Sequence, residues 1–182
     1  MKATDGSDAG ERAYGIVVMG VSGTGKTTLS QRLGTHLHCP VLEGDDFHSA
    51  ANVAKMRSGH PLTDADRWPW LDRLGAAIGE AAHGSGVAVA ACSALRRSYR
   101  ERLSAAAGVP LFFVLLDTDA DEIARRMRGR PGHYMPPSLL DSQLATLERP
   151  GPGECALTLD AGQPPKRLVG DTLAWVETMQ AA

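Results

Sequence analysis

Apolar runs alternate with amphipathic segments along most of the chain. Short runs that are almost entirely apolar predict strands, and the run at residues 87–92 is expected to be covered on both faces of a sheet. These runs cover residues 14–19, 40–43, 87–92, 111–116 and 156–159. Between them, apolar residues recur at helical spacing. The predicted helices cover residues 26–37, 50–56, 98–106, 119–128 and 168–179. A further helix is predicted to begin at Asp66 or Arg67, and another contains Leu140, Leu144 and Leu147. Strands that alternate with helices predict an α/β domain, in which about five parallel strands carry helices on both faces in three layers.

Size and composition narrow the class of protein. The chain has 182 residues, which suits one domain over residues 14–182. Residues 1–13 are polar and lack the apolar core of a signal peptide, so we expect a flexible tail. No apolar stretch approaches the roughly 20 residues that a membrane span needs. The net charge of -2 gives no electrostatic reason to expect nucleic acid as a partner. Three cysteines without C-x-x-C spacing favour a reducing compartment, and we expect a soluble, cytoplasmic protein.

The first predicted strand runs directly into the octet GVSGTGKT at residues 20–27, which matches G-x-x-x-x-G-K-[ST]. A strand before it and a helix after it are the context that makes this pattern a phosphate-binding loop. Glycines let backbone N–H groups approach phosphate oxygens, and the helix adds its positive dipole end. Lys26 can reach the β- and γ-phosphates, and the Thr27 hydroxyl is placed to bind Mg²⁺. The predicted nucleotide contacts are Gly20, Ser22, Gly23, Thr24, Gly25, Lys26, Thr27 and Thr28.

Asp45 follows the second predicted strand. Ligands of parallel sheets bind at the carboxyl ends of the strands, so the Asp45 carboxylate is expected to face the γ-phosphate. There it would orient or deprotonate an acceptor hydroxyl, or contact Mg²⁺ through water. The alternative role of a helix N-cap suits Asp46 better than Asp45.

An arginine-rich segment precedes a stretch of glycine and proline. Arg125, Arg126, Arg128 and Arg130 could form ordinary solvated surface at a helix end. The irregular segment after them favours a mobile lid over about residues 126–137 instead. Phosphoryl transfer spreads negative charge over oxygens that guanidinium groups match well, so Arg126 and Arg130 are candidate catalytic residues.

Other classes of nucleotide-binding protein fit the sequence less well. A GTPase would need N-K-x-D for guanine, and that tetrapeptide does not occur. A dinucleotide site would need G-x-G-x-x-G, whereas Gly23-Thr24-Gly25 continues as Lys-Thr-Thr. A small-molecule kinase remains, with an acceptor pocket beside the γ-phosphate.

Several further blocks resemble gluconate kinases of the phosphate-loop type. Beside the loop, these blocks are EGDDFH at 43–48, NVAKM at 52–56, GHPLTD at 59–64, DRWPWL at 66–71, ACSALRRSYR at 91–100, RPGHYM at 130–135 and LLDSQL at 139–144. The phosphate loop alone is widespread, but these blocks in this order are specific to the family. Ser49 stands where the family often has proline, and Arg96 replaces the commoner lysine.

The resemblance implies transfer of the ATP γ-phosphate to the 6-hydroxyl of D-gluconate by a homodimer. It also implies the fold shared by shikimate and adenylate kinases, with Arg126 near the adenine and phosphates and Arg130 in the lid. Gluconate is an anion rich in hydroxyl groups, so its pocket needs cations and short polar groups. Beside Asp45, the candidates are His48, Lys55, Arg67, Ser93, Arg96, His133 and Gln143. A kinase for another small acid and an ATP-binding regulatory protein remain as alternatives.

Overall fold

The computed structural model describes residues 13–128 and 137–182. Five strands form one sheet: β1 (Tyr14–Met19), β2 (Val41–Glu43), β3 (Val87–Ala91), β4 (Leu111–Asp117) and β5 (Ala156–Asp160). Their spatial order is β2-β3-β1-β4-β5, and every pairing is parallel. The fold class predicted from the apolar runs is therefore confirmed.

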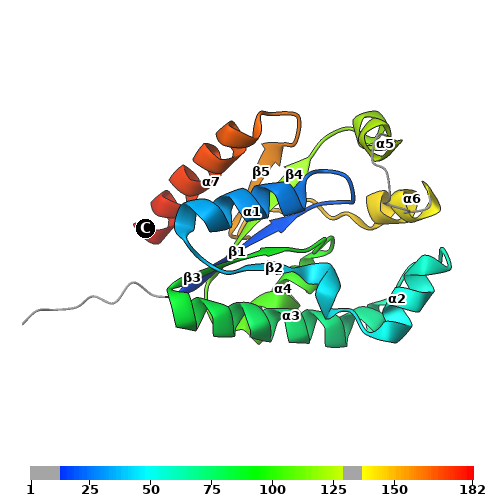
Figure 1. Cartoon of the computed structure of the whole chain (residues 1–182), viewed down its shortest axis with the longest axis horizontal. Coiled ribbons are helices and arrows are strands. Elements are labelled where there is room, and N and C mark those ends of the chain that lie inside the picture. The colour runs from blue at the N-terminus through cyan, green and yellow to red at the C-terminus, as the bar shows by residue number, and fades with distance from the viewer. Residues whose placement is uncertain (1–12, 129–136) are drawn as a thin grey trace, which may run out of the picture.

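Helices cover both faces of this sheet (Figure 1). They are α1 (Lys26–Leu37), α2 (Ala50–Arg57), α3 (Asp64–Ser85), α4 (Arg97–Ala107), α5 (Ala120–Arg128), α6 (Pro137–Thr146) and α7 (Pro165–Gln180), with a 3₁₀ turn η1 (Gly44–Phe47). One buried cluster joins α1 and α7 to the sheet through Leu29, Leu33, Leu168 and Val176. A second cluster joins α3 and α4 to the opposite face through Leu71, Leu74, Ile78 and Leu103. The two clusters produce the three predicted layers.

One predicted helix start needs correction. The third helix begins at Asp64, because Thr63 and Asp66 form a capping box in which each side chain binds the backbone N–H of the other. Pro69 therefore lies in the second turn of this helix. Helix α2 is capped by Ser49, whose hydroxyl accepts the N–H of Asn52 at 3.1 Å, so Asp46 is not its cap. A serine thus caps this helix at the position where the family often has proline.

The carboxyl ends of the strands gather the segments that the sequence singled out. The phosphate loop follows β1, η1 follows β2, and residues 92–96 follow β3. Helices α2, α5 and α6 lie at this same end of the sheet (Figure 1). Within the described ranges, no helix is long and apolar enough to cross a membrane.

Candidate functional site

The phosphate loop is shaped by its glycines. Gly20 has a φ of 139°, and a Cβ there would lie 2.6 Å from the carbonyl oxygen of Leu116. Gly25, at the N-cap of α1, has a φ of 98°. A side chain at either position would be strained, because residues with a Cβ rarely adopt these angles. Thr24 is buried, and its hydroxyl donates to the Val21 carbonyl at 2.9 Å, which closes the loop on itself.

Lys26 and Thr27 begin helix α1 beside this loop. The Lys26 ammonium donates to the Val21 carbonyl at 3.0 Å, so the cation lies across the loop. The Thr27 hydroxyl donates to Oε2 of Glu43 at 2.8 Å. Because its hydrogen is used in this bond, the Thr27 oxygen keeps its lone pairs for a cation.

Glu43 is a candidate site residue that the sequence reasoning missed. Burial raises the pKa of the Glu43 carboxyl, while the hydrogen bond from Thr27 lowers it. Asp45 also raises this pKa and Lys26 also lowers it, so both charges act on the Glu43 carboxylate. The hydrogen bond from Thr27 to Glu43 thus links the phosphate loop to the strand that leads into Asp45. The available signal was the position of Glu43 as the last residue of a strand whose carboxyl end faces the loop.

Asp45 lies in the turn η1, which a tryptophan holds in place. Trp70 is 2% exposed, and its indole N–H donates to the Gly44 carbonyl at 2.7 Å. His48 stacks on the same indole, with ring centroids 4.1 Å apart, and its backbone N–H donates to the Asp45 carbonyl. Trp70 thus packs in the core and also holds the backbone of the residue that precedes Asp45. Asp45 itself is exposed.

Burial lowers the pKa of the His48 imidazole, and the neighbouring Asp45 opposes this effect. The ring is therefore neutral near pH 7. Its Nδ1 atom is buried and has no hydrogen-bond partner within residues 13–128 and 137–182. A buried polar atom of this kind is suited to a hydroxyl group of a ligand.

Arg67 and Arg96, from α3 and the start of α4, meet at one carboxylate. Nη1 of Arg96 lies 3.2 Å from Oδ2 of Asp64, and Nη1 of Arg67 lies 3.8 Å from Oδ1. The Tyr99 hydroxyl donates to Asp64, and both guanidinium groups lie over the Tyr99 ring, 5.3 and 5.9 Å from its centre. Burial and the bond to Asp64 raise the pKa of Tyr99. We call this group of four the arginine cluster. It carries a net charge of about +1, which matches one ligand carboxylate.

Two of the polar residues predicted to bind substrate have structural partners. The Lys55 ammonium lies 2.7 Å from Oδ2 of Asp66 and ties α2 to the start of α3. Hydrogen bonds from Lys55 and Thr63 lower the pKa of Asp66 to about 2. The backbone carbonyl of Ser93 accepts the N–H of Gly20 at 3.3 Å. The binding of substrate by the Lys55 and Ser93 side chains stays a prediction.

Arg126 extends from α5 toward the loop after β5. Its guanidinium donates to Glu122 at 2.7 Å and to the Ala161 carbonyl at 3.0 Å. Arg125 and Arg126 lower the pKa of Glu122 to about 2. This geometry fixes Arg126 at the far side of the phosphate loop from Asp45. Two other predicted residues, Arg130 and His133, lie outside the described residues, as does most of the predicted lid.

Gln143 meets the phosphate loop itself. Its side-chain oxygen accepts the backbone N–H of Ser22 at 2.7 Å. The sequence placed Gln143 in the sugar pocket, and its contact in the structure is instead with the nucleotide-binding loop. Its predicted role toward the substrate is untested by this contact.

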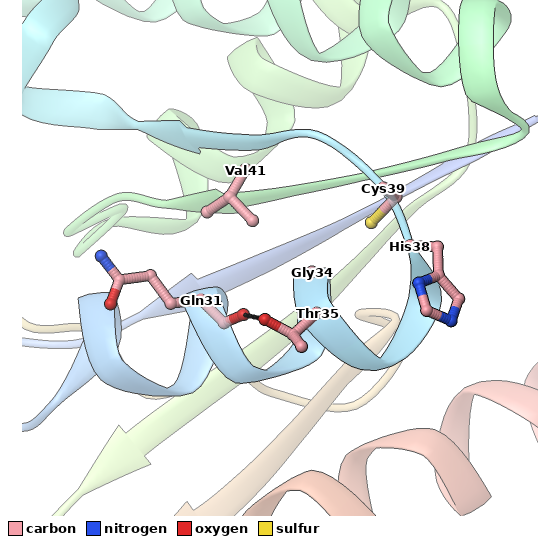
Figure 2. Close-up of a pocket in the computed structure, with 6 residues that line it drawn as sticks. All are labelled: Gln31, Gly34, Thr35, His38, Cys39 and Val41. Atoms are coloured by element: carbon pink, nitrogen blue, oxygen red, sulfur yellow. Dashed lines mark hydrogen bonds between the residues drawn. The ribbon is translucent and has the colours of Figure 1, made fainter.

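A separate hollow of about 480 Å³ lies beside α1 and β2 (Figure 2). Its lining residues are Gln31, Gly34, Thr35, His38, Cys39 and Val41. None of the predicted site residues lines it, and it lies along the later turns of α1, away from the phosphate loop. We assign it no part in the site.

A metal ion at this site would have few protein ligands. Among the described residues, no group of three His, Cys, Asp or Glu side chains is placed to hold a metal. Mg²⁺ is commonly held by substrate phosphates together with one or two protein oxygens. The Thr27 hydroxyl and the Glu43 carboxylate fit this pattern.

Known proteins resemble the chain across most of its length. A family model described as an AAA domain matches residues 16–150. A gluconokinase of Gluconobacter oxydans (strain 621H) is 51% identical over 154 residues, which cover 82% of this chain and 84% of the relative. The thermoresistant gluconokinase of Escherichia coli (strain K12) is 39% identical over 86% of this chain and 90% of its own length.

Solved structures agree with these relatives. The crystal structure of a gluconokinase from Sinorhizobium meliloti 1021 superposes with a TM-score of 0.80 and 43% identity, covering 93% of this chain and 94% of that one. A shikimate kinase from Aquifex aeolicus, at 14% identity and a TM-score of 0.56, shares the fold alone. With the phosphate loop, Asp45 and the arginine cluster at one end of the sheet, these similarities show that the chain belongs to the gluconokinase family.

Proposed function

We propose that the protein transfers the γ-phosphoryl group of ATP to the 6-hydroxyl of D-gluconate, giving 6-phospho-D-gluconate and ADP. The hydrogen bond from Thr27 to Glu43 supports this reaction, because it joins the phosphate loop to the strand that leads into Asp45. The choice of D-gluconate as the acceptor rests on the similarity to the gluconokinase relatives.

The donor half of the site is the phosphate loop. Backbone N–H groups of the loop and of the first turn of α1 bind the phosphates, and the Lys26 ammonium moves from the Val21 carbonyl to the phosphate oxygens. Bound Mg²⁺ would neutralise negative charge on the β- and γ-phosphates. Thr27 would hold it, with Glu43 orienting the Thr27 hydroxyl. Arg126 would lie at the nucleotide end, near its contact with Ala161.

The acceptor half begins at Asp45. Its carboxylate orients the 6-hydroxyl and accepts the proton as that oxygen bonds to the γ-phosphorus. The bond between the γ-phosphorus and the bridging oxygen breaks, and ADP leaves with the electron pair. A water-mediated contact from Asp45 to Mg²⁺ is compatible with this role.

The remaining groups fit the rest of gluconate. The net positive charge of the arginine cluster suits its carboxylate, with Arg67 and Arg96 already held by Asp64. Because the guanidinium groups are already held in place before the substrate binds, less side-chain conformational entropy is lost on binding. The unpartnered Nδ1 of the neutral His48 suits a hydroxyl group along the sugar chain.

We further propose that the enzyme is a cytoplasmic homodimer. The resemblance in sequence supports the dimer. The three free cysteines are compatible with a reducing compartment.

The function is tested by ADP release in a coupled assay with an acceptor panel. We expect turnover with D-gluconate in the presence of Mg²⁺, and none with shikimate or nucleoside monophosphates. Turnover confined to another acid would make the protein a kinase of different specificity. Tight ATP binding without acceptor-dependent turnover would favour a regulatory ATP-binding protein.

A further inference from the structure

We propose that Arg73 is a positioning residue of the acceptor site, which holds the last residue of the turn η1 against helix α3 and so helps to place the Asp45 carboxylate. The inference rests on the proposed function for the role of Asp45 in catalysis. Arg73 acts through the backbone of the turn and binds neither ATP nor the acceptor.

Two side chains of α3 hold the turn, one at each end. The indole N–H of Trp70 donates to the carbonyl of Gly44, the first residue of η1, at 2.7 Å. Nε and Nη2 of Arg73 both donate to the carbonyl of Phe47, its last residue, at 3.1 and 2.8 Å. Trp70 and Arg73 are three positions apart, so they lie on the same face of α3. Asp45 lies between the two anchored residues.

The turn needs anchors because it holds itself together weakly. It is a 3₁₀ helix of four residues, a structure whose internal hydrogen bonds have poor geometry. The bond from the His48 N–H to the Asp45 carbonyl is accordingly long, at 3.3 Å. Because Asp45 is exposed, the path of the backbone rather than packing around the side chain sets the direction of its carboxylate. With the Gly44 anchor alone, the turn could pivot about its first residue.

The contact between Arg73 and Phe47 does not compete with a substrate. Neither residue belongs to the groups proposed to bind ATP, Mg²⁺ or gluconate. The anchor can therefore stay in place while the substrates bind and react. Its loss should act on the alignment of Asp45, and hence on kcat, more than on the affinity for either substrate.

Arg73→Met tests this, because methionine keeps much of the length of the side chain and removes its donors. Arg102→Met is the matched control, since Arg102 also donates twice to a residue next to Arg73 on α3, Asp72, at 2.5 and 2.7 Å. In ADP-release assays we expect Arg73→Met to lower kcat by a factor of two to about five, the upper value being that of one ordinary hydrogen bond. The KM values for gluconate and ATP should stay within twofold of wild type. Arg102→Met should keep kcat, and an equal kcat in the two variants would overturn the proposal.

Hydrogen exchange tests the anchor without any substrate. Backbone amides in peptides that cover residues 44–48 should exchange at least twice as fast in Arg73→Met as in wild type and in Arg102→Met. Faster exchange would support the anchor even in an enzyme that phosphorylates an acceptor other than gluconate. Unchanged exchange would overturn the anchor whatever the acceptor is.

A double-mutant cycle shows whether Arg73 acts through Asp45. In an Asp45→Asn background, Arg73→Met should change the residual kcat less than twofold, because the carboxylate that the turn places is gone. An equal loss of kcat in both backgrounds would overturn the proposal. So would an Arg73→Met enzyme with normal kcat and a raised KM for gluconate, since Arg73 would then bind the substrate. Circular dichroism confirms that each variant is folded.

Discussion

Gly44 connects β2 to the turn that carries Asp45, and a methyl group there should disturb catalysis. A Cβ at Gly44 would lie 2.5 Å from the Ala91 carbonyl oxygen and 3.3 Å from the Cα of Cys92. Both neighbours are backbone atoms of the adjacent strand and its end, so neither can rotate away. In Gly44→Ala the turn η1 must therefore move outward, and Asp45 moves with it.

The size of the effect follows from this contact. Real Cβ atoms essentially never lie closer than 3.0 Å to such an atom, so the turn must move by at least about 0.5 Å. Overpacking of this kind costs about 1–3 kcal/mol of stability. A misplacement of about 1 Å can cost on the order of 10²-fold in rate, so half of that distance should lower kcat about tenfold. The bond from Trp70 to the Gly44 carbonyl should weaken as well.

The test compares Gly44→Ala with Gly84→Ala by ADP-release kinetics and urea denaturation. Gly84 lies in the last turns of α3, and a Cβ there meets nothing within 4 Å. Gly84→Ala should keep kcat and gain about 0.5–1 kcal/mol, because alanine favours a helix over glycine. If Gly44→Ala keeps kcat within twofold of wild type, the placement of Asp45 by this turn is wrong.

Four further outcomes are expected. Lys26→Ala should lower kcat on the order of 10²-fold or more in steady-state assays, since charge on the transferring oxygens loses its cation. Asp45→Asn should keep ATP affinity by calorimetry while kcat falls sharply, and normal turnover would remove Asp45 from the mechanism. Arg100 is 2% exposed and paired with Glu154, so Arg100→Met should cost about 3–5 kcal/mol in urea titrations. Burial lowers the pKa of His48, so the unfolded chain takes up this proton first, and stability should fall as pH drops below about 6.5. His48→Gln should reduce this dependence of the free energy of unfolding on pH. An unchanged pH dependence would exclude His48 as its source.

Much of the fold could be predicted from local patterns. Each buried strand is an apolar run, and the loop after β1 carries its own signature of glycines, lysine and threonine. Helix boundaries were less accurate where side chains determine them. The capping box of Thr63 and Asp66 starts α3 at Asp64, before the predicted start at Asp66 or Arg67, whereas α2 starts at Ala50 as predicted.

The candidate site was predictable in its members and less so in their partners. Asp45, Arg67 and Arg96 could be proposed as site residues because residue type and position at a strand end or helix start limit what they do. The sequence could not indicate that Asp64 holds both arginines, or that Gln143 reaches Ser22, since these contacts join residues far apart in the chain. Glu43 was missed because its contact with Thr27 depends on the packing of β2 beside α1.

Phosphorus NMR of the reaction mixture tests the central claim most directly. With ATP, Mg²⁺ and D-gluconate, we expect ADP and one new phosphomonoester resonance, split into a triplet by the two protons on C6. A resonance split by a single proton would place the phosphate on a secondary hydroxyl. Either that result or the absence of any gluconate-dependent phosphomonoester would contradict the account.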